Sequence, residues 1–471
     1  MVGDPLRYPV LLCFCAHSFM QCFVFMDFST VETLAEHSLN MTGSAKAAEV
    51  GLLYYGGFAA TLPSMLVALW LMLHGYDRAA GRCMSLLIVM GSWLRLYAAI
   101  VHSYAGALAS TILLGCAGGV IFTSFTFLPE RWFPDHERGF ATALAVQSNY
   151  AGWAVGALNP AMFGGSLFGG MAKPTEQGLR RFLVVQAIVV SFLLPLHLMT
   201  NWRAPRSSSP DGASPGANCG SSDANCGHSA GSAISHPGNE VQSPASLSAG
   251  ATASMLIRRP QYMIHSLCYA MLGAVGYAVT GVMNECLSAA SIAFTAHETM
   301  WLNFAFIASG VFVGLLTGRY TPFRRYSIVI KSLFLTGAVS LLCVQLLLIA
   351  GRNGVIRAKA TLLPLLVLLM ILAGAGTLGF TSLGLRIAVH ESRPALELYS
   401  GSIIEFFLLG ISCMLGLLSY VLPPENTFWF FALPAGVACG VIFCCARFPQ
   451  AEDLYSEHGL LARPDNSRTC D

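Results

Sequence analysis

Twelve apolar runs constrain the fold of this chain more than any other feature of its sequence. Each has about the 20 residues that a helix needs to cross the hydrocarbon core of a bilayer. Only 11% of all residues are charged, whereas soluble domains carry roughly a quarter. We therefore expect an all-α polytopic membrane protein with about 12 transmembrane helices. The runs span 8–31, 49–73, 83–104, 105–128, 139–163, 179–201, 261–286, 298–318, 327–350, 360–386, 397–421 and 427–446.

One long polar segment, 202–256, divides the runs into two sets of six. Ser, Gly, Pro, Ala and Asn dominate the segment, so it has too few apolar side chains to form a core of its own. We expect it to be a disordered cytosolic linker. It would connect an N-terminal six-helix bundle at 1–201 to a C-terminal six-helix bundle at 257–446, which a cytosolic tail follows at 447–471.

Basic residues indicate how the chain is oriented in the membrane. Loops on the side of the first residue carry about twice as many Lys and Arg residues as loops on the other side, and cytosolic loops are enriched in both. We therefore predict that both termini are cytosolic. Asn40 begins a glycosylation triplet, Asn-Met-Thr, in the first outer loop. In the tail, Leu460 and Leu461 follow Glu457 and resemble an acidic dileucine signal, so we expect an acidic organelle membrane or the plasma membrane.

Short clusters of charged residues, named here charged knots, recur at equivalent places in the two halves. The loop between the fourth and fifth spans reads His-Glu-Arg at 136–138, and the loop between the tenth and eleventh reads His-Glu-Ser-Arg at 390–393. Short basic loops at 75–82 and 318–325 also correspond. Such repetition is typical of transporters built from two parallel repeats. We therefore expect the two six-helix bundles to be pseudo-symmetric.

The charged knots are also candidates for a cytosolic gate, in which ion pairs join the two halves while a central cavity faces outward. Each exposed pair contributes only about 0–1 kcal/mol, but several together can bias an equilibrium of a few kcal/mol. The alternative is that these charges only set the orientation. The gate candidates are Asp77, Arg78, Arg82, Glu137, Arg138, Arg319, Glu391 and Arg393.

The segment WFPDHERGFATALAVQSNYAGWAVG at 132–156 resembles the fourth-to-fifth-span pattern of solute carrier family 49, a group of the major facilitator superfamily that includes the feline leukaemia virus subgroup C receptors and disrupted in renal carcinoma protein 2. The seventh span is similar too, since Tyr269, Tyr277 and Asn284 recur at the family's spacing. The resemblance implies the major facilitator fold and transport of a small organic nutrient such as choline, ethanolamine, haem or pyridoxine. In choline-type members two aromatic residues flank the cation, and Phe25 and Tyr277 match those positions.

Ionisable side chains inside the apolar runs are further candidates for a functional site, because they are costly in lipid. Asp27 and Glu405 are candidates for binding a cationic substrate or carrying a proton. The alternative for Asp27 is that it faces the outer water or takes part in an inner hydrogen bond. The alternative for Glu405 is a structural pair, for which Arg95 in the third span is the partner considered; this pair would cross the two halves, and the sequence cannot show that contact.

The fifth span carries a polar and aromatic face. Asn149 and Trp153 lie four residues apart and therefore on one side of a helix. Tyr150 stands where the choline-type members have a glutamine. Such a face lines a substrate cavity in one interpretation, and in the other it bonds a neighbouring helix.

These features favour a secondary active or facilitative transporter that works by alternating access as a monomer, with a small-molecule substrate, the bilayer and protons as its partners. Alternatives are a non-transporting receptor or sensor on the same scaffold, and a carrier for an unrelated solute such as an amino acid or a sugar. We find no catalytic motif and expect no enzyme, no cofactor and no metal. The near balance of 26 Lys+Arg and 24 Asp+Glu argues against a nucleic-acid binder.

Overall fold

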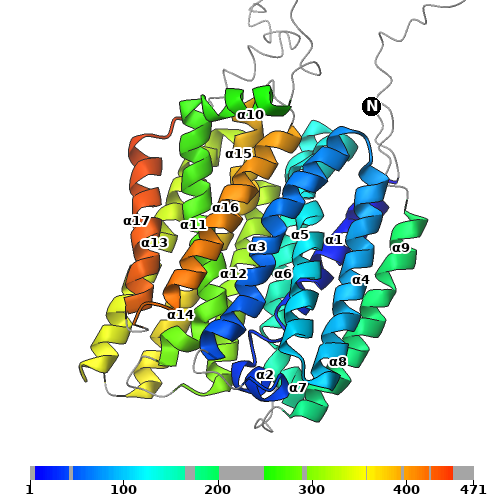
Figure 1. Ribbon diagram of the computed structural model, residues 1–471. Helices are drawn as coiled ribbons and strands as arrows, with labels where there is room; N and C mark the ends of the chain where they lie inside the picture. The colour runs from blue at the N-terminus through cyan, green and yellow to red at the C-terminus, as the bar shows by residue number, and fades with distance from the viewer. Residues whose placement is uncertain are drawn as a thin grey trace, which may run out of the picture.

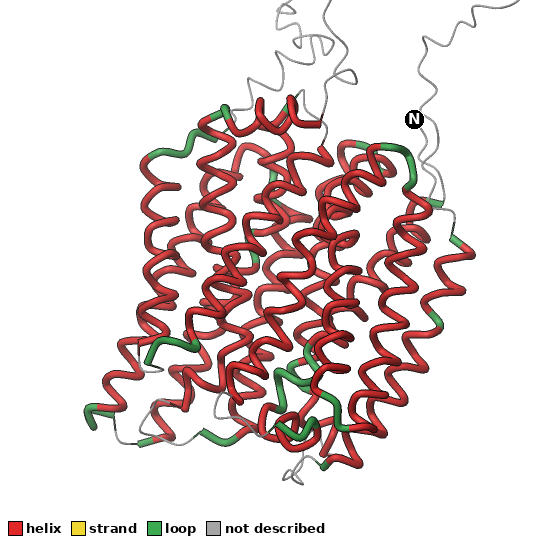
Figure 2. The backbone as a smooth tube through the Cα atoms, in the orientation of Figure 1, coloured by secondary structure: helices red, strands yellow, loops and turns green. Residues whose placement is uncertain are grey.

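The computed structural model describes residues 6–41, 46–164, 175–200, 249–288, 294–356, 358–393, 397–423 and 426–448. The regular elements within these ranges are helices (Figures 1 and 2). Eleven of the helical segments are long and apolar enough to cross a membrane. A further helix, α6 (Asp135–Gly156), lies between two of them and is less apolar because it carries the charged knot and a polar face. The chain is a multi-pass membrane protein, and each predicted span is helical.

The N-terminal half contains nine helices within the described residues, and their bounds follow the predicted spans closely. They are α1 (Arg7–Phe25), α2 (Glu32–Ser38), α3 (Lys46–Leu73), α4 (Asp77–Val101), α5 (Tyr104–Trp132), α6, α7 (Asn159–Gly164), α8 (Glu176–Ser191) and α9 (Leu193–Met199). Local signals set several boundaries. The side chain of Thr175 caps α8, and His102, in the left-handed region at φ 56°, ends α4.

The C-terminal half follows the same plan. Its elements are α10 (Ala249–Ile257), α11 (Pro260–Ser288), α12 (Ala296–Tyr320), the 3-10 turn η2 (Phe323–Arg325), α13 (Tyr326–Arg352), α14 (Lys359–Leu378), α15 (Thr381–Ser392), α16 (Glu397–Ser419) and α17 (Thr427–Cys444). A capping box between Thr295 and Glu298 starts α12. The pairs α8–α9 and α14–α15 are each one span interrupted by a break. The first pair is the last span of the N-terminal half, and the second is the fourth span of the C-terminal half.

The two halves repeat one pattern of helix neighbours. In the N-terminal half α5 packs against α3 and α4, α1 packs against α6, and α4 packs against α8. In the C-terminal half α14 packs against α12 and α13, α11 against α16, and α13 against α17. The halves meet chiefly through α6 with α12 and α3 with α16, which are equivalent pairs in the repeat. The expectation of two related six-span bundles is confirmed by this arrangement, in which the halves lie side by side (Figure 1).

Both ends of the described chain lie at one face, which we call the N face. It holds the start of α1, the helix α10 and the end of α17, at the top of Figure 1. The opposite surface, the far face, holds α2 and α7. Asn40 is exposed and follows α2 at the far face. Its glycosylation and the cytosolic location of the N face stay predictions, and the two are consistent because Asn40 and the N face lie on opposite sides.

Some boundaries differ from the sequence expectation. The first span ends at Phe25 rather than at residue 31, because the buried side chain of Asp27 is bound by neighbouring helices in the turn that follows. The last residues of the predicted linker, from 249 onward, form α10. The rest of the linker, at 202–248, and the tail with its dileucine pair lie outside the described residues.

Candidate functional site

Six aromatic side chains from both halves meet between the bundles. The closest pair joins the halves, with the ring centroids of Trp153 and Tyr277 4.3 Å apart. Tyr150 also meets Tyr277 edge to face, with centroids 5.6 Å apart. Such edge-to-face pairs are favourable at centroid separations of about 4.5–7 Å. All six are buried, lie on α1, α3, α6 and α11, and are named here the aromatic centre: Phe25, Tyr54, Phe58, Tyr150, Trp153 and Tyr277.

Glu405, on α16, is buried next to this centre. Tyr269 of α11 donates a 2.7 Å hydrogen bond to its Oε1 atom, and its Oε2 atom has no hydrogen-bond partner. The carboxyl group lies within electrostatic range of Tyr150 and Tyr277. In the part of the chain that the structure describes, the ion pairs do not include Glu405. A carboxyl group so placed has a free acceptor for a proton or for a donor on a ligand.

Four other buried polar atoms, on α6 and α11, also make no hydrogen bond of standard geometry within the described residues. Such atoms are uncommon in native proteins, since each costs about 1–3 kcal/mol. Comparable atoms occur on other helices, for example in Asn303 of α12, so those near the aromatic centre are candidate ligand contacts. The four atoms are Oε1 of Gln147, Oδ1 of Asn149, Nε1 of Trp153 and the hydroxyl of Tyr277; Cys22 lies near Asn149 and Trp153, and Tyr150 lies near Tyr277.

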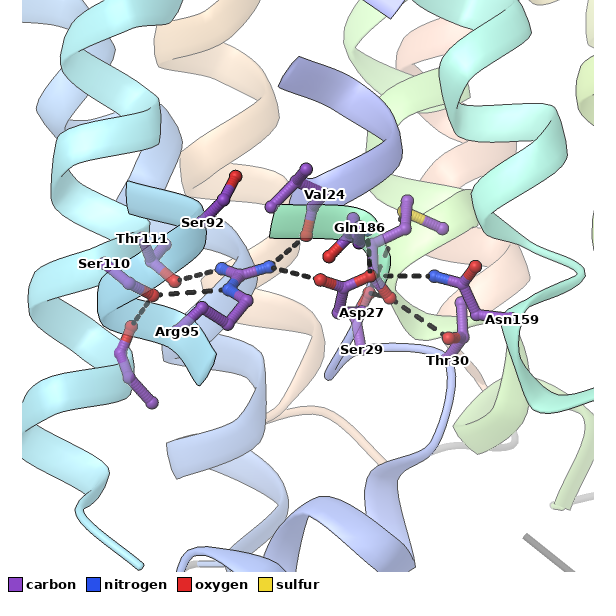
Figure 3. Close-up of polar contacts among 12 residues, drawn as sticks. Val24, Asp27, Ser29, Thr30, Ser92, Arg95, Ser110, Thr111, Asn159 and Gln186 are labelled. Atoms are coloured by element: carbon purple, nitrogen blue, oxygen red, sulfur yellow. Dashed lines mark hydrogen bonds and ion pairs between the residues drawn. The ribbon is translucent and has the colours of Figure 1, made fainter. Parts of the chain in front are cut away.

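Asp27 has a different environment, shown in Figure 3. Its Oδ1 atom accepts hydrogen bonds from Asn159 at 3.1 Å and from Gln186 at 3.0 Å. Its Oδ2 atom lies 3.6 Å from Nη1 of Arg95. Both ionic groups are buried, at 0% exposure for each residue. Arg95 therefore pairs with Asp27, and not with Glu405, which was the partner considered from the sequence.

Arg95 satisfies its remaining donors within the same half. It donates to the hydroxyl of Ser110 at 3.2 Å, to the hydroxyl of Thr111 at 2.8 Å and to the carbonyl of Val24 (Figure 3). A buried ion pair is tolerated only when further hydrogen bonds compensate for the lost hydration. The network therefore fixes the end of α1 against α4, α5, α7 and α8, and Phe25, one residue after Val24, is held in the aromatic centre.

On the far side of the aromatic centre, two adjacent tyrosines of α3 connect the halves. The Tyr54 hydroxyl lies 3.0 Å from the Thr280 hydroxyl and 3.4 Å from the Tyr277 carbonyl. The Tyr55 hydroxyl donates to the Ala278 carbonyl at 3.0 Å. Soon afterwards α11 leaves helical geometry, at Val282. Broken helices beside the substrate site are common in transporters.

On the N-face side, other contacts connect the halves. The Arg319 guanidinium lies over the Phe140 ring, 5.3 Å from its centroid. Arg386 of α15 lies against the backbone of Gly139 on α6. The Thr126 hydroxyl of α5 donates to the Glu397 carbonyl at 3.1 Å. The aromatic centre thus has contacts between the halves on both of its sides.

The ion pairs at the N face differ from the expected gate. Asp77 pairs with Arg131 at 3.1 Å, and Arg7 pairs with Glu137 at 3.1 Å, both within the N-terminal half. Glu391 pairs with His265 at 2.7 Å within the C-terminal half. Each of these three carboxylates pairs with a residue on an adjacent helix of its own bundle.

The remaining gate candidates are distributed in the same way. Arg138 pairs with Glu130 at 2.8 Å on the neighbouring helix, and Arg259 donates to the Arg393 carbonyl in the C-terminal half. Arg78 and Arg82 lie in the first two turns of α4. Arg319 contacts the other half, with its guanidinium over the ring of Phe140.

Most of the predicted substrate-site residues lie close together. Phe25, Tyr150, Trp153 and Tyr277 are in the aromatic centre, and Tyr269 and Glu405 are bonded beside it. Asn149 faces α1 instead, with Nδ2 3.2 Å from the Ser18 hydroxyl. Asp27 belongs to its separate network. The side chain of Asn284 lies outside what the structure describes.

Sequence reasoning missed the contribution of α3. Tyr54 and Phe58 stand one helical turn apart with their rings in contact, at 5.0 Å between centroids. Phe25 reaches them across a close approach at Gly57, where a Cβ atom would collide with its ring. The signal in the sequence is the aromatic pair at a spacing of four beside two glycines, Gly56-Gly57, within an apolar run.

No protein-family model matches the chain. Two curated relatives, the solute carrier family 49 member 4 homologs of Xenopus tropicalis and Xenopus laevis, are each 29% identical to it over 156 residues, which is 31% of this chain and 32% of each relative. The alignment thus spans about a third of the length of these relatives.

Solved structures match almost the whole chain. The major facilitator superfamily transporter FucP in its outward conformation superposes with a TM-score of 0.62 at 14% identity, over 94% of this chain and 100% of FucP. A bacterial homolog of the human lysosomal transporter Spinster, in an inward-facing conformation, gives a TM-score of 0.52 at 14% identity, over 94% of this chain and 95% of that one. The chain therefore has the major facilitator superfamily fold and, over about a third of its length, resembles solute carrier family 49 member 4.

Proposed function

We propose that the chain is a secondary carrier that moves a small organic nutrient across a membrane by alternating access. The observation that carries this proposal is a cluster of buried polar atoms that make no hydrogen bond of standard geometry, on Trp153, Tyr277 and Glu405 among edge-to-face rings at the junction of the halves. A purely structural core would pair such atoms or replace them with apolar groups. The transporter names of the similar proteins support the same reading.

The donor set favours a pyridoxine-like substrate among the nutrients considered. A flat ring bearing hydroxyl groups stacks against aromatic side chains and exchanges hydrogen bonds with Nε1 of Trp153, the Tyr277 hydroxyl and Oε2 of Glu405. Haem carries two carboxylates that need cationic partners, and the buried Arg95 is already paired with Asp27. Choline has a single hydroxyl and would leave more of these donors and acceptors unpaired.

Glu405 is the proposed proton carrier. A bare carboxylate buried without a cation is costly, so transfer of a proton to Glu405 and its release are tied to whether the centre is open to water. Asp27 was also a candidate in the sequence, but its ion pair with Arg95 and two amide donors already favour the charged form. A proton gradient would then drive transport through Glu405 alone.

Alternation would proceed by opening one set of contacts between the halves at a time. The far-side set is Tyr54 with Thr280 and Tyr55 with Ala278. The N-face set includes Arg319 with Phe140 and Arg386 with Gly139. Each set consists of weak contacts, so opening either one costs little, which suits exchange between two states of similar free energy. We propose the plasma membrane or an acidic organelle membrane as the location, with the N face in the cytosol.

Uptake by purified protein in proteoliposomes tests the function. Radiolabelled pyridoxine, choline, ethanolamine and haem would each be offered with and without an inward proton gradient. The proposal predicts saturable pyridoxine uptake that the gradient accelerates. Saturable binding of a solute without accumulation would instead support a non-transporting receptor. Uptake of an amino acid or a sugar in place of these four would retain the carrier and reject the proposed substrate class.

A further inference from the structure

Outside the aromatic centre, three metal-ligating side chains meet in the N-terminal half. Cys13 and His17 lie four residues apart on α1 and so share one face. His197, on α9, approaches the same face, with its ring centroid 5.4 Å from that of His17. All three are buried, and one ligand atom from each lies within 4.8 Å of the other two. Neither the aromatic centre nor the Asp27 network uses these residues.

The distances fit a coordinated metal ion. Sγ of Cys13 lies 3.7 Å from Nδ1 of His17. A metal atom about 2.3 Å from sulfur and about 2.0 Å from nitrogen, with ligands at trigonal angles, would hold those two atoms roughly 3.7 Å apart. The spacing of Cys13 and His17 therefore suits an ion between them, once Nδ1 of His17 leaves the Cys13 carbonyl.

Surrounding groups orient the ligands. Nδ1 of His17 lies 2.7 Å from the Cys13 carbonyl, which can only accept a hydrogen bond, so Nδ1 carries the ring proton in this arrangement. Metal binding through Nδ1 would shift the proton to Nε2, which lies 3.0 Å from the Ser85 hydroxyl of α4 and could donate to it. The Thr200 hydroxyl donates to the Cys13 sulfur at 3.3 Å, a bond that a thiolate strengthens.

We propose that Cys13, His17 and His197 form a binding site for a monovalent copper ion. Thiolate and imidazole ligands suit soft and borderline metals, which points to Cu⁺ or Zn²⁺ rather than Mg²⁺ or Ca²⁺. Charge decides between the two. One thiolate and two neutral imidazoles give a neutral complex with Cu⁺ and a net positive complex with Zn²⁺, and a buried net charge is costly. Arg82 lies within electrostatic range of His197 and disfavours the added positive charge further.

A bound ion would connect α1 to α9, the last described helix before the long polar segment. This role differs from transport, so a test of the copper site does not depend on whether the proposed substrate is correct. Because the ion binds the folded arrangement of two separate helices, it would also raise the thermal stability of the protein.

Copper binding by the full-length protein in lipid nanodiscs tests the site. Cu⁺ would be supplied under ascorbate, with bicinchoninate as a competitor that strips weak sites. We expect the wild-type protein to retain one tightly bound equivalent and Cys13→Ser to lose it, with affinity reduced more than the roughly 10–100-fold typical of second-shell changes. Cys83→Ser, which removes an exposed thiol of α4, is the matched control and should keep the ion.

X-ray absorption at the copper edge supplies a readout that needs no variant. The proposal predicts one sulfur and two nitrogen ligands around the ion in the wild-type protein, and a rise in melting temperature with Cu⁺ that His197→Gln removes. Retention of the equivalent in a folded Cys13→Ser protein, or a copper environment without sulfur, would overturn the site. Tighter binding of Zn²⁺ than of Cu⁺ through the same ligands would overturn the choice of ion.

Discussion

Tyr269 donates a 2.7 Å hydrogen bond to Glu405, and through this contact α11 is joined to α16 beside the aromatic centre. The second carboxyl oxygen of Glu405 has no partner, whereas both carboxyl oxygens of Asp27 contact donors or a cation. The two buried carboxyl groups are therefore expected to have different roles. Asp27 would support the fold, and Glu405 would act in transport.

The pair of Asp27 and Arg95 should be essential for stability. Asp27→Asn leaves the buried guanidinium without its counter-ion, and breaking such a pair costs about 3–5 kcal/mol. We expect a large fall in melting temperature in detergent for this variant. The double variant Asp27→Asn with Arg95→Met removes both charges and should recover part of the loss. If the loss of stability in the double variant equalled the sum of the losses in the two single variants, the two residues would not be coupled as the geometry indicates.

Removal of the Tyr277 hydroxyl should weaken substrate binding and leave folding intact. The hydroxyl lies near the Tyr150 hydroxyl but makes no hydrogen bond of standard geometry, so Tyr277→Phe removes little contact within the protein. Loss of one hydrogen bond to the substrate, worth about 0.5–1.5 kcal/mol, should raise KM roughly two- to tenfold. The measurement is the initial uptake rate against substrate concentration. Tyr97→Phe, at an exposed tyrosine of α4, is the control and should leave KM unchanged.

The far-side contacts should control opening toward the far face. Tyr54→Phe deletes the hydroxyl that meets Thr280 and the Tyr277 carbonyl. Losing about 1 kcal/mol of stabilisation from these hydrogen bonds should make the state that is open toward the far face roughly fivefold more populated. Hydrogen–deuterium exchange of peptides that cover residues 277–283 should accelerate accordingly. Unchanged exchange there, with a folded protein, would remove Tyr54 from the set of contacts that opens.

Close helix packing at Gly374 should not tolerate a side chain. A Cβ atom at this position of α14 would overlap the backbone carbonyl of Phe306 on α12. Backbone cannot move aside as a flexible side chain does, so Gly374→Ala should sharply reduce the yield of folded protein. Gly410→Ala is the matched control, because no heavy atom lies within 4 Å of its added Cβ. Size-exclusion profiles of the two variants in detergent give the comparison.

The span pattern and the repeat were predictable from sequence because the bilayer requires long apolar helices. Periodic features of this kind depend on local composition alone. Phe25 and Tyr277 were proposed in advance through a family resemblance, and Trp153 through its spacing on a helix. In the structure the three lie in one cluster, in which Phe58 joins Phe25 to Trp153 and Trp153 meets Tyr277 across the halves.

Partners of buried charges were not predictable. Arg95 lies 68 residues from Asp27 in sequence, and which carboxylate it meets depends on how the helices rotate and cross. The partners of the gate charges depend on packing in the same way, and Glu137 pairs with Arg7 in its own bundle. The charge of a residue determines which kinds of group it can bind, but tertiary packing determines which residue becomes its partner. The α3 tyrosines were missed because an uncharged aromatic in an apolar run resembles ordinary core.

Proton-driven uptake by the Glu405→Gln variant tests the central claim most directly. Glutamine keeps the size of the side chain and an acceptor for Tyr269 but cannot exchange a proton. Reconstituted wild-type protein and Glu36→Gln, a control in α2 away from the centre, should both transport substrate faster under an inward proton gradient. We predict that Glu405→Gln folds and binds substrate but shows no acceleration by the gradient. A response to the gradient equal to that of the wild-type protein would contradict the account.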